Sequence, residues 1–297
     1  MTALGALNAV FQASLFLMIF TLVLSLGLSF TVAQVLSPLG RWQVVGAMLV
    51  INVLLVPVVA IAIARLLPIT QDQVIGLVLV CIASAGPAGL KAAQLAKRSD
   101  MALAVSMVVL LMVVNIVAAP LWAQAVVTGA SVSAWGIVED LLILVLIPLV
   151  LGLLAHARYT EHAEEWKVKL EGFSNIALMI AIVTGVLVNW ADIVSLLGSW
   201  VLVAATVQIL AFMAMGATVG FIGKRSTPTA LSGAMVTGMR FQPLGLIIIT
   251  TQLAGNGAYL APALVFALID TFLMFGIGIE LGHRAKPDSP RAAVTTQ

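Results

Sequence analysis

Charged residues are scarce in this chain. Of its 297 residues, 62% are hydrophobic and only 9% are Asp, Glu, Lys or Arg, whereas a soluble domain carries roughly a quarter charged residues. So few charges can neither cover the surface of a water-soluble globule nor keep a disordered chain solvated. The composition excludes both classes and predicts a protein that crosses a membrane several times.

Cysteine, histidine and net charge exclude further classes. Cys81 is the only cysteine, which excludes a disulfide framework and a thiolate cluster. His156, His162 and His283 fall near predicted loops or span ends, so we expect no metal site and no cofactor. The net charge of +2 gives no support for a nucleic-acid partner.

About nine segments are long and apolar enough to cross a bilayer, which takes about 20 residues of helix. They are 8–32, 44–67, 73–97, 101–127, 136–157, 169–190, 199–222, 228–252 and 258–282. These segments predict one all-α transmembrane domain over residues 1–286, followed by a short cytoplasmic tail, 287–297. The first segment is not expected to be a cleavable signal peptide, because residues 1–35 contain no Lys or Arg and the apolar stretch is too long.

The basic residues predict the orientation of the spans. Nine crossings place the termini on opposite sides, and the loops of one side contain only Arg65. The other side carries Arg41, Lys97, Arg98, Arg158, Lys167, Lys169, Lys224, Arg225, Arg284, Lys286 and Arg291. Since cytoplasmic loops are enriched in Lys and Arg, we expect an outside N-terminus and a cytoplasmic C-terminus in the plasma or inner membrane. Lys91 and Arg240 lie inside spans and are not explained by topology.

Segments 41–98 and 199–256 read as an internal repeat. Each opens with a Trp, continues through an apolar span to a basic residue and a Pro, and ends in a span that is interrupted near its middle. The interruptions contain Gly86, Pro87 and Gly89 in the first copy and Gly238 and Pro243 in the second. An odd number of spans separates the copies, so they would have opposite orientations. Pro and Gly could simply kink these helices, but two broken helices at equivalent places in an inverted repeat favour a secondary transporter.

These motifs also resemble a known family. The run from Gly86-Pro87-Ala88-Gly89 to Ala102-Leu103-Ala104-Val105, the pair Gly238-Met239 before a polar cluster, and Phe266 before a polar pair are similar to the bile acid:sodium symporter family. The resemblance extends over about residues 18–284. It implies that two broken helices cross at the midplane and that substrate binds between a core and a panel domain. The implied core contains spans 44–67, 73–97, 101–127, 199–222, 228–252 and 258–282, and the implied panel contains spans 8–32, 136–157 and 169–190.

The chain departs from the family where sodium binds. Sodium-coupled members carry a Ser-Asn pair after the first break, where this chain has Leu90-Lys91-Ala92-Ala93. They carry Glu-x-Gly-x-Gln at the second break, where this chain has Val236 and Arg240 in place of Glu and Gln. Val236 cannot coordinate an ion, and Arg240 would repel a cation beside it. We therefore expect Lys91 and Arg240 to replace the sodium ions with fixed positive charges.

Three charged residues inside spans are the principal candidates for substrate binding, because charge within a bilayer is costly and marks function or pairing. Lys91 is predicted on the first turn of the half-helix that Pro87 opens, where free N–H groups and the helix dipole favour an anion. Its side chain could instead extend to the cytoplasmic interface. Arg240 either contacts a ligand or pairs with Asp270, which could instead carry a proton. The further candidates are Thr271, Gln242, Asn52 and Thr237; Asn115 and Gln208 are interpreted as helix–helix hydrogen bonds.

The predicted function is alternating-access transport of a small organic anion, by proton coupling, exchange or uniport. The alternatives are sodium-coupled symport of bile-acid-like or carboxylate substrates and an anion channel. An intramembrane enzyme is not expected, since only one Asp and no His lie at midplane depth. The predicted partners are the anion, the lipid bilayer and a coupling proton or Na⁺.

Overall fold

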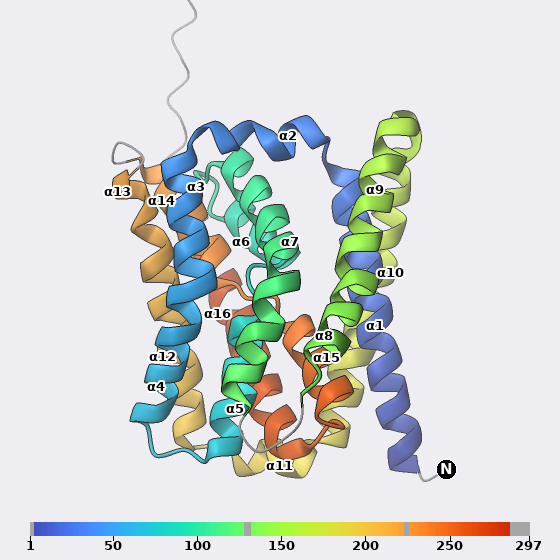
Figure 1. Cartoon of the computed structure of the whole chain (residues 1–297), viewed down its shortest axis with the longest axis vertical. Coiled ribbons are helices and arrows are strands. Elements are labelled where there is room, and N and C mark those ends of the chain that lie inside the picture. The colour runs from blue at the N-terminus through green and yellow to red at the C-terminus, as the bar shows by residue number, and fades with distance from the viewer. Residues whose placement is uncertain (1–2, 128–131, 223–225, 286–297) are drawn as a thin grey trace, which may run out of the picture.

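Helices make up almost all of the computed structural model, which describes residues 3–127, 132–222 and 226–285 (Figure 1). They are α1 (Ala3–Ser29), α2 (Val32–Leu36), η1 (Ser37–Gly40), α3 (Trp42–Val50), η2 (Ile51–Leu55), α4 (Val56–Leu66), α5 (Gln71–Ile82), α6 (Pro87–Leu95), α7 (Met101–Val126), α8 (Ala134–Leu141), η3 (Leu142–Leu146), α9 (Ile147–Arg158), α10 (Thr160–Val188), α11 (Trp190–Ser195), α12 (Trp200–Ala217), α13 (Val219–Ile222), α14 (Thr227–Gly238), α15 (Gln242–Gln252) and α16 (Gly257–Arg284). These ranges contain no β-strand. The all-α class predicted from the sequence is confirmed; the predicted tail lies outside the described residues.

The membrane spans agree closely with the predicted segments. In the described part of the chain, 7 stretches of helix are long and apolar enough to cross a membrane, and α5 with α6 forms an eighth that bends by 73° at its break. The predicted span 228–252 is present as two shorter helices, α14 and α15, separated by three residues, Met239 to Phe241. About nine spans is therefore close to what the structure contains.

Two of the spans contain a π-helical turn that the sequence analysis did not predict. In η2 the Val56 N–H donates to the Ile51 carbonyl, five residues back, and η3 has the same bond from Ile147 to Leu142. A proline follows each turn, Pro57 in α4 and Pro148 in α9. Because proline has no N–H and its ring clashes with the carbonyl four residues before it, the preceding turn widens.

Helix packing depends on small residues at the closest contacts. In Figure 1, α1, α9 and α10 lie side by side at the right. A Cβ atom added to Gly27 of α1 would lie 2.8 Å from the Cα of Gly152 in α9. On the other side of the molecule, a Cβ added to Gly216 of α12 would lie 2.1 Å from the Gly233 carbonyl oxygen of α14. Glycine therefore allows these backbones to approach closely, as in other membrane bundles.

The two broken helices run in opposite directions. Figure 1 shows α6 above α5, whereas α15 lies below α14. Both first halves, α5 and α14, contain 12 residues and begin after a hydroxyl side chain that accepts a backbone N–H, Thr70 and Ser226 respectively. The internal repeat itself, and the division into core and panel, stay predictions.

Candidate functional site

The two helix breaks lie against each other inside the protein. The Phe241 N–H in the second break donates to the Ala83 carbonyl in the first, at 3.2 Å. Ala83 has no exposed surface, and Phe241 is 3% exposed. The unwound backbone is thus enclosed by protein, as is required at membrane depth. Together with the side chains described below, these two breaks form what we call the crossing.

Arg240 lies in the second break, and its side chain is fully buried. Its Nε and Nη2 donate to the Cys81 carbonyl at 2.9 and 2.6 Å. Its Nη1 donates to Asn52 Oδ1 at 2.9 Å and to the Thr237 carbonyl at 3.5 Å. The guanidinium also lies 5.8 Å from the centre of the Phe212 ring, within the range of cation–π attraction. Protein groups therefore surround and stabilise the positive charge.

The Arg240 guanidinium joins the C-terminal ends of two helices. Cys81 and Thr237 are the second-to-last residues of α5 and α14. The last four carbonyls of a helix have no partner within that helix and carry partial negative charge. The guanidinium supplies hydrogen bonds to both ends and neutralises their partial charge.

Asn52 connects the crossing to the span Trp42–Leu66. Its Nδ2 donates to Thr237 Oγ1 and to the Met48 carbonyl, both at 3.0 Å, while its Oδ1 accepts from Arg240. Asn52 lies in the π-helical turn η2, and π-helical turns often occur at functional sites.

Asp270 of α16 lies on the other side of the second break and is fully buried. Its Oδ2 accepts from the Arg240 backbone N–H at 3.0 Å and from the Gln242 side-chain nitrogen. These donors lie at the start of α15, the end of the helix that carries partial positive charge. Its Oδ1 is buried without a hydrogen-bond partner.

The side chains of Arg240 and Asp270 do not form an ion pair, one of the two arrangements that the sequence permitted. The carboxylate contacts the backbone of Arg240, whereas the guanidinium points to Cys81 and Asn52. Within the described ranges, the ion pairs are Arg41–Asp100, Lys167–Glu164, Lys169–Glu165 and Arg284–Glu280. The two buried charges of the crossing are thus each held by neutral groups.

Two residues interpreted as ordinary helix contacts also support the first break. The Asn115 amide, with its nitrogen toward the break, donates to Ser84 Oγ at 3.3 Å and to the Ile82 carbonyl at 3.2 Å, and accepts from the Ser84 N–H at 3.1 Å. Gln208 accepts from the Cys81 thiol at 3.8 Å. No sequence pattern identifies the Cys81 carbonyl or the Phe212 ring as contacts of Arg240, because both contacts depend on how distant helices pack.

Lys91 and Thr271 lie apart from this network. Lys91 is the fifth residue of α6, so it lies just beyond the first turn rather than within it as predicted. Its side chain is exposed and has no hydrogen bond or ion pair within the described chain. Thr271 Oγ1 donates to the Ala267 carbonyl of its own helix at 2.8 Å.

The glycines of the breaks differ in their steric roles. A Cβ atom on Gly86 would lie 2.6 Å from the Phe241 ring. On Gly89 the nearest atom, Val236 Cα, would be at an ordinary 3.5 Å. On Gly238 it would meet the flexible end of the Met274 side chain. Of these three glycines, only Gly86 is therefore required by close packing against a rigid neighbour.

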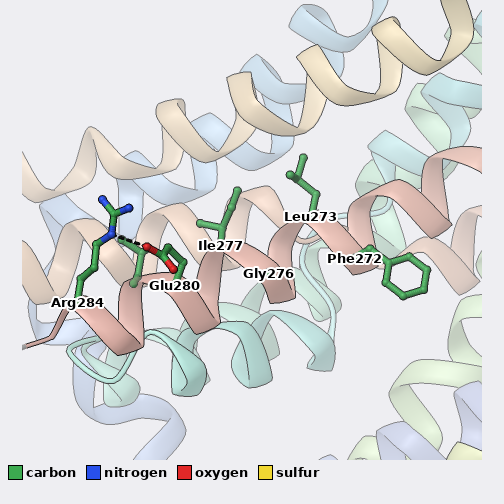
Figure 2. Close-up of a pocket in the computed structure, with 7 residues that line it drawn as sticks. Phe272, Leu273, Gly276, Ile277, Glu280 and Arg284 are labelled. Atoms are coloured by element: carbon green, nitrogen blue, oxygen red, sulfur yellow. Dashed lines mark hydrogen bonds and ion pairs between the residues drawn. The ribbon is translucent and has the colours of Figure 1, made fainter.

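A groove of about 350 Å³ lies along the exposed side of α16, two residues beyond Asp270 in sequence (Figure 2). Figure 2 shows Phe272, Leu273 and Ile277 projecting from this one helix, with the Glu280–Arg284 ion pair at its C-terminal end. Neither Asp270 nor Thr271 lines the groove. The groove and the crossing are thus separate features.

The crossing contains the elements by which secondary transporters bind ions: two broken helices, their free ends, and buried polar groups between them. A model of the Sodium Bile acid symporter family matches residues 15–199. The chain belongs to the sodium bile acid symporter family. Members of this family are transporters, and this protein is accordingly a multi-pass membrane transporter.

The family match covers the first broken helix but not the second. It ends at Ser199, just before α12, so Arg240 and Asp270 lie beyond it. A comparison with curated proteins gives no match.

Proposed function

We propose that this symporter-family protein carries a small organic anion by alternating access without using sodium, and that Arg240 acts as a built-in cation. The guanidinium of Arg240, buried between the C-terminal ends of α5 and α14, is the observation on which the proposal depends.

The position of this charge explains why sodium would be dispensable. In transporters with broken helices, unwound carbonyls and half-helix C-terminal ends coordinate the coupling cation. Here the Cys81 carbonyl accepts two hydrogen bonds from the guanidinium, and the Thr237 carbonyl accepts a third. A sodium ion about 4 Å from Arg240 would be repelled by about 4 kcal/mol at an effective dielectric constant near 20.

The charge distribution favours an anionic substrate. Lys91 is exposed on the half-helix that begins at Pro87, and its charge has no ion-pair partner among the described residues. Pro87 starts α6, and Pro243 is the second residue of α15. Both are partly exposed, whereas Arg240 is buried. We call the partly exposed surface at these two helix starts the rim. An anion at this rim would be attracted by Lys91, by both helix N-termini and by the field of Arg240. Thr271 and Gln242 are proposed to line the same rim.

The transport cycle would move the proposed core against the proposed panel, α1, α8–α10 and η3. We place the protein in the plasma or inner membrane with the C-terminus in the cytoplasm, as the distribution of Lys and Arg predicts.

Ion replacement in proteoliposomes tests the proposal. Uptake of labelled pyruvate and taurocholate should be unchanged when Na⁺ is exchanged for K⁺ or choline at constant pH. A collapse of uptake would show that sodium coupling is kept through a rearranged site. Counterflow of unlabelled anion distinguishes a carrier from an anion channel, which would show none.

A designed variant tests the role of Arg240 itself. Val236→Glu with Arg240→Gln recreates the Glu-x-Gly-x-Gln pattern of sodium-coupled relatives. Its free energy of unfolding should increase with Na⁺ concentration, by about 2.7 kcal/mol when Na⁺ is at 100 times its Kd. The wild type should not respond to Na⁺. Val236→Gln with Arg240→Gln is the matched control, since it removes the same cation but adds no carboxylate. If the Glu variant and this control respond equally to Na⁺, Arg240 does not occupy a cation site.

A further inference from the structure

The carboxylate of Asp270 accepts fewer hydrogen bonds, and has fewer positive charges in contact with it, than a fully buried ionised carboxylate needs. One oxygen, Oδ2, accepts two hydrogen bonds from neutral groups, and the other, Oδ1, has no partner. The side chain has no exposed surface. An ionised carboxylate without a cation at contact distance is unfavourable in such a place, and it tends to be neutralised by a proton.

The charges around Asp270 are few. The buried titratable groups near it are Arg240, in the second break, and Cys81, in the last turn of α5. On the other helices packed against α16, Asp72 lies in the first turn of α5, Lys91 is exposed on α6, and Asp192 lies in the first turn of α11. The segments of α12, α14 and α15 contain no charged residue.

The two buried neighbours, Arg240 and Cys81, do not gain or lose a proton in the crossing. Arginine stays protonated in proteins. The Cys81 thiol is neutral as a donor to Gln208. Asp270 is therefore the buried group in the crossing that can gain or lose a proton.

We propose that Asp270 binds the proton that travels with the anion; this rests on the proposed transport of an anion. The proton comes from water on one side of the membrane, binds Oδ1, and is released on the other side. While Asp270 is ionised, its charge balances that of Arg240. Once it is protonated, the positive charge of Arg240 is left unbalanced and favours an anion at the rim. By thermodynamic linkage, a bound anion raises the affinity of Asp270 for the proton by the same factor as the proton raises the affinity for the anion. One proton accompanies one anion, and transport of a monovalent anion is electroneutral.

Infrared spectroscopy of the protein in lipid tests proton binding without a substrate. On acidification, the wild type should gain a C=O band of a protonated carboxylic acid that Asp270→Asn does not gain, in addition to the bands of the other Asp and Glu side chains, which both proteins share. Asn keeps an oxygen to accept from Arg240 and Gln242 and places its NH₂ at the unpartnered position, so the fold should be retained; size-exclusion chromatography checks this. Glu280→Gln, on the exposed end of the same helix, should keep the band. Identical acid-induced C=O bands in the wild type and Asp270→Asn overturn the proposal.

Transport measurements test the coupling. In proteoliposomes with an inward proton gradient, labelled pyruvate or taurocholate should accumulate about tenfold for each pH unit, because one unit is equivalent to a tenfold concentration ratio. Asp270→Asn should lose the accumulation that the proton gradient drives. Uptake that is Na⁺-independent and also indifferent to the gradient overturns this inference and leaves the proposed function intact. Na⁺-dependent uptake contradicts the proposed function instead.

Discussion

Arg240 shows at the scale of one residue how a cation is kept inside a membrane protein. A charge at the bilayer centre costs about 2.5–3.5 kcal/mol on insertion scales. Here the cost is offset by hydrogen bonds to the Cys81 carbonyl, the Asn52 side chain and the Thr237 carbonyl. Lysine would keep the charge but has no planar fork with which two nitrogens could reach one carbonyl. Removing one hydrogen-bond partner of a buried group costs about 1–3 kcal/mol, and more when that group is charged.

Asp100, outside the spans, gives a prediction of pH dependence. It caps α7 by accepting the Leu103 N–H at 3.1 Å and pairs with Arg41 at 2.6 Å. Partial burial raises the pKa of Asp100, but the hydrogen bonds from Arg41 and Leu103 outweigh it, and the pKa lies below its ordinary value of 3.8. A lowered folded-state pKa means that the stabilisation is present above the unfolded-state pKa and is lost as pH falls through the folded-state pKa. We expect thermal stability to fall in this acidic range by less in Asp100→Ala than in the wild type.

Two substitutions separate the roles of Asp100. At neutral pH, Asp100→Ala should lose about 0.5–2 kcal/mol as the cap is lost. Asp100→Ser keeps a cap and loses only the pair with Arg41, which is partly exposed and contributes about 0–1 kcal/mol. Equal destabilisation of both variants in thermal unfolding would mean that the ion pair, not the cap, is the main contribution.

At the scale of an element, the first break depends on one of the two glycines that flank Pro87, Gly86 and Gly89. Gly86→Ala places a methyl group 2.6 Å from the Phe241 ring and should displace the second break from the first. We expect a large loss of anion uptake and a destabilisation of about 1–3 kcal/mol, as for overpacked cores. Gly89→Ala is the control: it meets only ordinary contacts and raises helix propensity by about 1 kcal/mol. Equal loss of uptake in both variants would contradict this assignment.

The sequence predicted the spans and breaks well, because both depend on local composition. Apolar runs of about 20 residues and Gly-Pro pairs are visible without any partner. The π-helical turns before Pro57 and Pro148 were missed, because a proline in a span predicts a kink but not which hydrogen bond gives way.

The contacts of the crossing could not be predicted in the same way. Arg240 and Asp270 stood out because charge is rare in a span, but the geometry between them was left open. The guanidinium reaches the Cys81 carbonyl, 159 positions away, and a backbone carbonyl has no signature in sequence. Lys91 was grouped with them because of its charge, although its side chain is exposed on α6. Residue type thus selected Arg240 and Asp270 as candidates, and helix packing determined which groups their side chains contact.

At the scale of the whole molecule, the proposed panel and core are joined at one end by polar contacts. Thr251 Oγ1 of α15 donates to Asp140 Oδ2 of α8 at 2.8 Å. The neighbouring Gln252 side chain lies against Gly136, where an added Cβ would be 2.8 Å from its nitrogen. If transport requires the core to move against the panel, this contact must open in each cycle.

A reversible cross-link tests that motion. Asp140→Cys with Thr251→Cys places two thiols where side chains now touch, and Hg²⁺ should bridge them and stop anion uptake until dithiothreitol removes the metal. Thr251→Cys alone controls for Hg²⁺ reacting with one thiol or with the native Cys81, which is buried. Because the bridge closes this contact without touching Arg240 or Asp270, the infrared band of Asp270 should persist while uptake stops. Uptake that continues at the same rate through the bridged protein would show that α8 and α15 move together, and the proposed division into panel and core would then be wrong.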